Sequence, residues 1–330
     1  SFKKAFILMK KIVIPILMLC VNSTFASENN GSSRFTPSDL SISLSSGLLL
    51  NSKAKELVYM DDQSKASELT WDTNSANIIN AEINWQIHPK FSFNARGWST
   101  LSKNSSVMNN YDWMSETDRD LLTDWSHHDR TPLNFANEFD FNVNINLLDT
   151  PHYKLGTLLG YQQNRYSWSA MGGSYYYSEQ DDDGDYVEGS ALSNVGEFDP
   201  NEKLIGYKQK FKMPYIGIYN KFEYNNFELN TTLKYSRWVN ASDRDNHYLR
   251  DTTFDTKASN GRYYGAIVNA GYNIRPDTKL FTEYAWNQYK HVTTDLVMME
   301  NQTNEISSSK DGGGISNKSQ SVSLGIAYTF

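Results

Sequence analysis

The chain has 330 residues, a formal net charge of −7 and an aromatic content of 14%. The acidic balance argues against a nucleic-acid-binding protein, because phosphates attract basic surfaces. The one cysteine, Cys20, lies in an apolar N-terminal stretch, so we expect no disulfides in the exported chain.

The first element in chain order is that apolar stretch. Two lysines precede an apolar run at residues 12–21, and small residues follow it. This order is typical of a signal peptide, here cleaved after Ala26. We expect residues 1–26 to be removed and residues 27–330 to form a single domain. No later segment approaches the ~20 apolar residues that a membrane-spanning helix needs.

Beyond the signal, apolar and polar residues alternate almost everywhere. Clear examples lie at residues 80–87, 138–147 and 227–236. Successive side chains of a strand point to opposite faces. Soluble sandwich strands also alternate, but they are usually about half this length. Long alternating stretches with aromatic residues at the ends of the apolar rows are typical of barrels with a lipid-facing exterior and a polar lumen.

The connections between these stretches are of two kinds. Four are tight turns, at 88–90, 149–152, 224–226 and 275–278. Five are long polar stretches, which we expect to be loops, at 51–75, 103–133, 167–206, 241–261 and 292–318. Alternating short and long connections predict an all-β fold, a ten-stranded antiparallel transmembrane β-barrel with long extracellular loops and short periplasmic turns.

A barrel of this size has little free interior. We expect its lumen to be filled by polar and charged side chains, namely Glu82, Glu138, Asp140, Lys154, Lys234 and Glu283. A diffusion pore is therefore disfavoured, and function is expected in the long loops.

The stretch Ser242–His247 is the clearest chemical motif in those loops. Asp245 and His247 are two residues apart, so in an extended segment their side chains point the same way. A carboxylate that orients an imidazole is a common general base near neutral pH. Considered alone, the same pattern is also typical of a solvated surface loop.

Several stretches together resemble one family, the omptins, which are ten-stranded outer-membrane proteases of Gram-negative bacteria. The resemblance spans nearly the whole chain after the signal. It is carried by Asp112-Trp113-Met114, Asn137-Glu138-Phe139-Asp140, Gly172-Gly173-Ser174-Tyr175, residues 205–209, residues 211–217, residues 242–248 and Tyr328-Thr329-Phe330.

The resemblance implies a catalytic dyad facing an acidic couple, with the attacking water between them. Asp245 and His247 match the dyad. The family pattern D-x-D-W-M matches residues 110–114, but the first carboxylate is Asn110 and only Asp112 is acidic. An amide can donate to a developing oxyanion but cannot act as a base. Three interpretations stay open: a weakly active protease, an inactive relative, and an engineered inactivating change.

The resemblance also implies where substrate binds. Glu56 and Asp243 match an acidic pocket that would bind Arg or Lys before the scissile bond. Asp124 matches an acidic position that would favour a basic residue after the bond, although it could equally be a solvated loop carboxylate. Ser126 next to His127 suggests a serine protease, which we reject because nothing places the two side chains together.

Outside the barrel, the family binds lipopolysaccharide through a polar and basic cluster that Tyr161, Arg165 and Lys210 match. The alternative is that these side chains simply reach the membrane interface. His127 and His128 point to opposite sides and have no evident third ligand, so we expect no metal. The acidic run at residues 179–185 is interpreted as a solvated tip.

The sequence thus predicts a monomeric outer-membrane endopeptidase with its active face outside the cell. It would cleave surface-accessible peptides or proteins at Arg or Lys, without a cofactor but with lipopolysaccharide as a possible activator. The alternative is a catalytically impaired barrel that serves as an adhesin or binding protein.

Overall fold

The described residues are almost all in strands. The structure, a computed structural model, describes residues 40–182, 184–187 and 189–330, so the expected signal peptide at 1–26 lies outside the described residues. Among the described residues no helix is long and apolar enough to span a membrane. The strands are β1 (Leu40–Tyr59), β2 (Lys65–His88), β3 (Phe91–Thr100), β4 (Asn104–Asp112), β5 (Asp124–Asp149), β6 (Tyr153–Tyr177), β7 (Asn194–Tyr224), β8 (Phe227–His247), β9 (Thr252–Arg275), β10 (Thr278–Glu300) and β11 (Glu305–Thr329).

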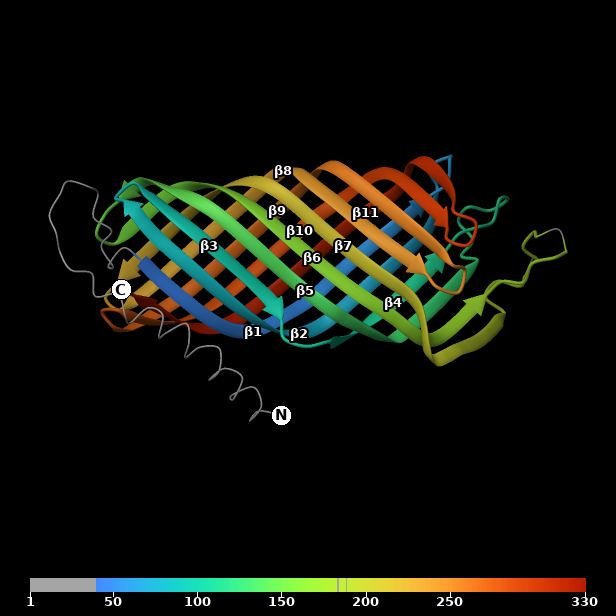
Figure 1. The fold of residues 1–330 in the computed structure, drawn as a ribbon, viewed down its shortest axis with the longest axis horizontal. Coiled ribbons are helices and arrows are strands. Elements are labelled where there is room, and N and C mark those ends of the chain that lie inside the picture. The colour runs from blue at the N-terminus through green and yellow to red at the C-terminus, as the bar shows by residue number, and fades with distance from the viewer. Residues whose placement is uncertain (1–39, 183, 188) are drawn as a thin grey trace. The chain divides into compact units, whose positions relative to one another are not determined.

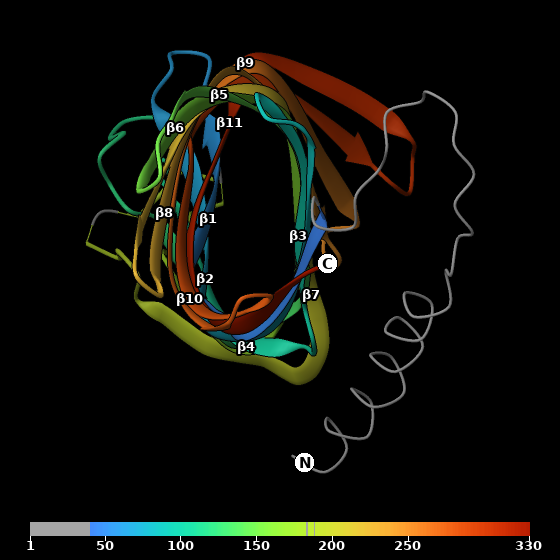
Figure 2. The same ribbon diagram turned by 90° about the vertical axis from the view of Figure 1, so that its left-hand side faces the viewer.

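The antiparallel sheet closes on itself. β1 pairs with β11 on one side and with β2 on the other, so neither end of the sheet is left free. β3 and β4 both pair with β2 and β5, and together they form one wall strand that is interrupted at residues 101–103. The ring therefore has ten members, as predicted. Figure 1 shows it from the side, and its closed outline is visible end on in Figure 2.

The four tight turns are confirmed, but the predicted bounds of the five long loops are wrong, and the longest connections that remain are 113–123 and 178–193. The β1–β2 pairing continues as far as Tyr59 and Lys65, so most of the predicted loop at 51–75 is strand. The other four long stretches are also largely absorbed into strands, including 241–261, where β8 runs to His247 and β9 begins at Thr252. Neighbouring strands satisfy each other's backbone groups whether or not their side chains are apolar, so polar, Tyr- and Thr-rich sequence can extend the wall.

The outer surface is apolar, as the alternation predicts. Large apolar side chains stand out from the wall, for example Phe139 at 54%, Leu159 at 54% and Leu324 at 70% relative exposure. Their partners one residue along the strand, such as Glu138, Asp140 and Ser323, are buried inside the ring.

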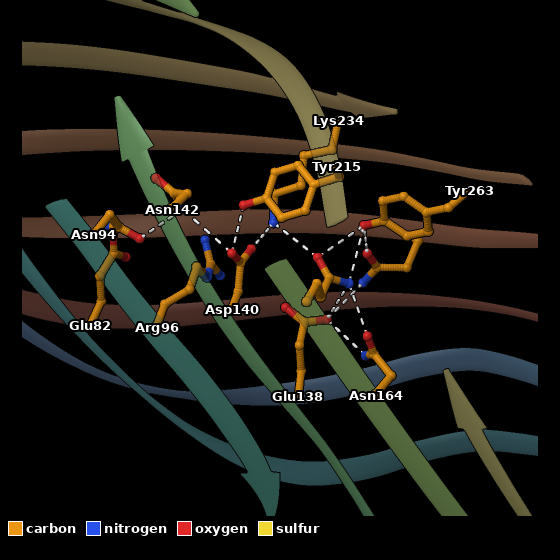
Figure 3. A network of polar contacts seen from close by, with 12 residues as sticks. Glu82, Asn94, Arg96, Glu138, Asp140, Asn142, Asn164, Tyr215, Lys234 and Tyr263 are labelled. Atoms are coloured by element: carbon orange, nitrogen blue, oxygen red, sulfur yellow. Dashed lines mark hydrogen bonds and ion pairs between the residues drawn. The ribbon is translucent and has the colours of Figure 1, made fainter. Parts of the chain in front are cut away.

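A polar network crosses the lumen (Figure 3). Asp140 and Lys234 form a buried ion pair, and the Tyr215 hydroxyl donates to the same carboxylate over 2.6 Å. Gln162 accepts from Lys234 over 3.2 Å and donates toward Glu138 over 3.3 Å, which carries the network across to β5. Side chains thus fill the lumen at this level, as predicted.

The remaining predicted lumen residues lie nearer the short turns. Glu283 is buried and pairs with Arg96 over 2.5 Å, whereas Glu82 and Lys154 are half-buried and line a polar cavity of about 320 Å³.

Between this network and the far rim lies a hydrophobic core that the sequence analysis did not predict. Trp71 stacks on Tyr207 with ring centres 5.1 Å apart, and Trp168 packs against both rings at 6.0 Å. All three side chains are almost completely buried. The Tyr207 hydroxyl donates to Asp243 over 2.8 Å, so this core supports the candidate site directly.

Candidate active site

The last residues of β8 carry the dyad. Asp243, Asp245 and His247 face inward and are buried, while Arg244 between them is exposed. His247 Nε2 lies 2.7 Å from Asp245 Oδ2, so the structure brings the predicted pair together. The edge of the Phe254 ring packs on the imidazole at 5.2 Å and limits its rotation.

The other ring nitrogen of His247 also has a partner. Arg250 Nη2 lies 2.7 Å from His247 Nδ1. A guanidinium can only donate, so Nδ1 accepts this hydrogen bond. The proton of the neutral ring is then on Nε2, where it is donated to Asp245. The sequence analysis did not identify Arg250, which lies in the short β8–β9 connection.

The end of β4 carries the second pair. Asn110 Nδ2 donates to Asp112 Oδ2 over 2.8 Å, and Ser67 Oγ donates to Asn110 Oδ1 over 3.1 Å. Burial raises the pKa of Asp112, and the nearby Asp124 carboxylate adds to this rise. Ser67 and the positive charge of Arg250 oppose it, which puts Arg250 within electrostatic reach of both pairs.

A cluster of three carboxylates includes the aspartate of the dyad. Glu56 on β1 joins Asp243 and Asp245, and all three are nearly inaccessible to solvent. Burial, reinforced by the charges of Asp245 and Asp243, raises the pKa of Glu56 well above its usual range. Burial likewise raises the pKa of Asp243 to about 7, although Thr256 and Tyr207 donate hydrogen bonds to it.

Two oxygens of this cluster lack a donor from outside the cluster among the described residues. Glu56 Oε2 and Asp245 Oδ1 are buried and accept no such hydrogen bond, although Glu56 and Asp245 lie close enough to share a proton. Buried carboxylates without donors are costly, because the fold removes water without replacing it. The cluster is therefore suited to a cationic group that would enter and satisfy these oxygens.

Asp124 lies opposite Asp112 in the β4–β5 register. Burial raises its pKa, and the Tyr186 hydroxyl donates to its Oδ2 over 3.1 Å. Tyr186 follows the acidic run 179–185, whose described carboxylates are exposed as expected. This tip is therefore anchored at the rim of the candidate site by a contact that the sequence analysis did not anticipate.

A serine–histidine pair is also present, but its surroundings do not suit a catalytic role. His128 Nε2 lies 3.0 Å from Ser126 Oγ, and its Nδ1 contacts the Gly172 carbonyl. His127 points elsewhere, to Asn109 Oδ1 at 2.8 Å. Burial lowers the pKa of His128, and no carboxylate is seen to hydrogen-bond to it in the described part of the chain. Within these residues no group of three His, Cys, Asp or Glu is placed to hold a metal ion.

The three residues matched to lipopolysaccharide binding lie on the outer surface of β6 and β7. Arg165 and Lys210 are direct neighbours across the two strands, and Arg165 Nε donates to Asn137 Oδ1 over 3.1 Å. Tyr161, four residues before Arg165 on the same face, is 44% exposed.

Comparison with known proteins covers nearly the whole chain. A model of the Omptin family matches residues 36–330. The chain is 41% identical to Protease 7 of Escherichia coli (strain K12), over 93% of this chain and 95% of that protein. It is 38% identical to Plasminogen activator of Yersinia pestis, over 98% of this chain and 100% of that protein. The crystal structure of the outer membrane protease OmpT from Escherichia coli is similar, with a TM-score of 0.84 and 40% identity over 91% of this chain and 99% of that one.

Proposed function

This chain belongs to the omptin family and is an outer-membrane protease, and we propose that it is an endopeptidase that cleaves after Arg or Lys. The observation that carries the specificity is the buried cluster of Glu56, Asp243 and Asp245, with two oxygens that lack donors from outside the cluster among the described residues. A basic side chain would enter this cluster and form charge-assisted hydrogen bonds. Asp124, at the far side of Asp112, would favour a second basic residue after the bond.

We propose His247 as the general base. Asp245 holds Nε2–H, which leaves the lone pair of Nδ1 to take a proton from water. The water oxygen then attacks the carbonyl carbon, and the imidazolium returns the proton to the leaving amine as the tetrahedral intermediate collapses. Asp245 stabilises the imidazolium by charge and by orientation.

The second wall would position that water. Asp112 can accept a hydrogen bond from it, and Asn110 can donate one through its amide, although its Nδ2 already binds Asp112. The amide cannot take a proton, so we propose low catalytic activity for the chain with Asn110.

The same residue motivates a second candidate function. A chain that binds basic segments in the Glu56 cluster but turns them over very slowly would act as a surface adhesin or binding protein. In either case we propose that the site faces the cell exterior. Lipopolysaccharide phosphates would pair with Arg165 and Lys210 on the outer wall, beside the exposed Tyr161.

One assay separates the two functions. The refolded protein, with and without lipopolysaccharide, is incubated with a quenched fluorescent peptide that contains Arg-Arg, and with a matched peptide that contains citrulline, the neutral analogue of Arg. We expect slow cleavage after Arg, none of the citrulline peptide, and no cleavage by His247→Ala. Tight binding of the Arg peptide without any cleavage, also after Asn110→Asp, would support the binding protein and overturn the protease.

A further inference from the structure

Arg250 occupies the nitrogen that the proposed reaction needs. His247 Nε2 is held by Asp245, so Nδ1 is the nitrogen available to water, and Arg250 Nη2 donates to it at 2.7 Å. While this hydrogen bond lasts, a water molecule cannot give its proton to His247. Arg250 must therefore leave Nδ1 before the base can act.

Arg250 has a second possible partner across the site. Its charge is close enough to oppose the rise that burial causes in the pKa of Asp112 and in that of Tyr177 on β6. The residue is exposed and follows the end of β8, so its long side chain has room to move. A guanidinium released from Nδ1 of His247 would thus be attracted by the carboxylate of Asp112.

Residue 110 sets the strength of this attraction. With Asn110, the β4 wall offers Arg250 one carboxylate, and that carboxylate is already bound by the Asn110 amide. With aspartate at position 110, carboxyl oxygens of two neighbouring residues would face Arg250, and a planar guanidinium can bind two such acceptors at once even where the two groups share one proton.

We propose that Arg250 is a positioning residue that acts as a latch on His247, and that residue 110 controls the latch. With Asn110, Arg250 rests on Nδ1 and blocks the base. With aspartate at 110, it is drawn to the acidic couple and the base is free. This rests on the proposed function, because it assumes that His247 is the base. It implies that Asn110 lowers activity in two ways, by weakening the couple and by leaving the latch closed.

The test is a double-mutant cycle in the full-length refolded protein. Arg250→Gln removes the positive charge. Arg250→Lys keeps the charge but replaces the planar guanidinium by a single ammonium group. Each is made with Asn110 and with Asn110→Asp. The matched control is Arg244→Gln on β8, where Arg244 is exposed and pairs with Asp255 away from the site.

We expect Arg250→Gln to raise kcat about tenfold in the Asn110 chain, the scale of one charge-assisted hydrogen bond, with a smaller change in KM. The kcat of Arg250→Lys should lie between the kcat of the Asn110 chain and that of Arg250→Gln. In the Asn110→Asp chain the gain should fall below about threefold, since coupled sites are not additive. Arg244→Gln should change kcat less than about twofold. A fall in kcat with Arg250→Gln, or an equal gain in both chains, would overturn the latch.

A readout without catalysis separates the latch from the proposed function. In ¹⁵N-histidine NMR spectra, with the His247 signals assigned from His247→Gln, Nδ1 should be unprotonated and should shift when Arg250→Gln is introduced. No shift would overturn the latch even in an active enzyme. A clear shift in a chain that cleaves nothing, with Asp or Asn at 110, would support the Arg250–His247 contact and overturn the proposed protease function.

Discussion

Replacing Asn110 by aspartate tests the second wall of the site directly. The Asn110 Nδ2–Asp112 Oδ2 distance of 2.8 Å would become a contact between two carboxylate oxygens. Two charges at about 3 Å repel by roughly 6 kcal/mol at an effective dielectric constant near 20. That corresponds to about 4 pKa units, so the pair would share one proton at neutral pH.

A shared proton gives the wall a group that can both accept from the attacking water and donate to the intermediate. Positioned acid–base catalysis contributes about 10²- to 10⁴-fold, and we expect a gain in kcat/KM of at least ~10²-fold for an Arg-Arg peptide. The assay is kcat/KM between about pH 5 and 9, where the variant should also show a new ionisation that the Asn110 chain lacks.

The matched control is Asn109→Asp, which adds the same charge one residue away. Asn109 Oδ1 faces Trp125 and His127, on the other face of β4, so this variant should gain nothing. If Asn110→Asp gains less than about threefold, or if Asn109→Asp gains as much, the assignment of residue 110 to an acidic couple is wrong.

Three further outcomes follow from the burial of charged groups. Because the pKa of Asp243 is about 7 and a cationic substrate favours its charged form, KM for an Arg peptide should fall as pH rises through 7, and Asp243→Asn should raise KM and flatten this dependence in the same assay. The raised pKa also means that the folded chain holds this proton more tightly than the unfolded chain. The stability of the free protein should therefore fall as pH rises from about 4 to about 7, less so in Asp243→Asn, as urea unfolding in detergent would show. In the lumen, Lys234→Ala leaves Asp140 buried without its cation and should cost about 3–5 kcal/mol of unfolding free energy, whereas Lys234→Ala with Asp140→Ala should recover part of this loss.

The wall of the barrel was predictable because alternation and tight turns are local signals. Strand number and direction followed from them, and so did the polar lumen around Asp140 and Lys234. The length of the strands did not follow, because outside the membrane both faces of the wall are polar or aromatic. Segments such as 51–59 then have the composition of a loop, although pairing with a neighbour makes them strand.

The site was predictable to the extent that it is local. Asp245 and His247 are two apart, and extended geometry alone places them together. Glu56 was found only through the family resemblance, because it reaches Asp243 by closure of the ring, and no local pattern encodes that contact. Arg250 and Ser67 carried no signal. Arg250 lies in a short connection, and the conformation of that turn brings it to His247. Ser67 lies in a polar strand and binds Asn110, which is far away in sequence.

One rule links the wall and the site. The alternation that buries Lys234 in the lumen is interrupted on β8 by register shifts between Ser236 and Ala241, and beyond them it brings Asp243, Asp245 and His247 inward in succession. A shift of one residue in the pairing of β8 would reverse every side chain. Arg244 and Asn246 would then face the site, and both the carboxylate cluster and the base would be lost together. The regular pairing of β8 with β7 and β9 from Ala241 to His247 is therefore needed for the chemistry of the site as well as for the fold. Deleting Asn246 moves His247 by one position and turns it away from Asp245, so it should abolish cleavage while the barrel still folds, as heat-modifiable migration in gels would show. Retained cleavage would refute this link between register and chemistry.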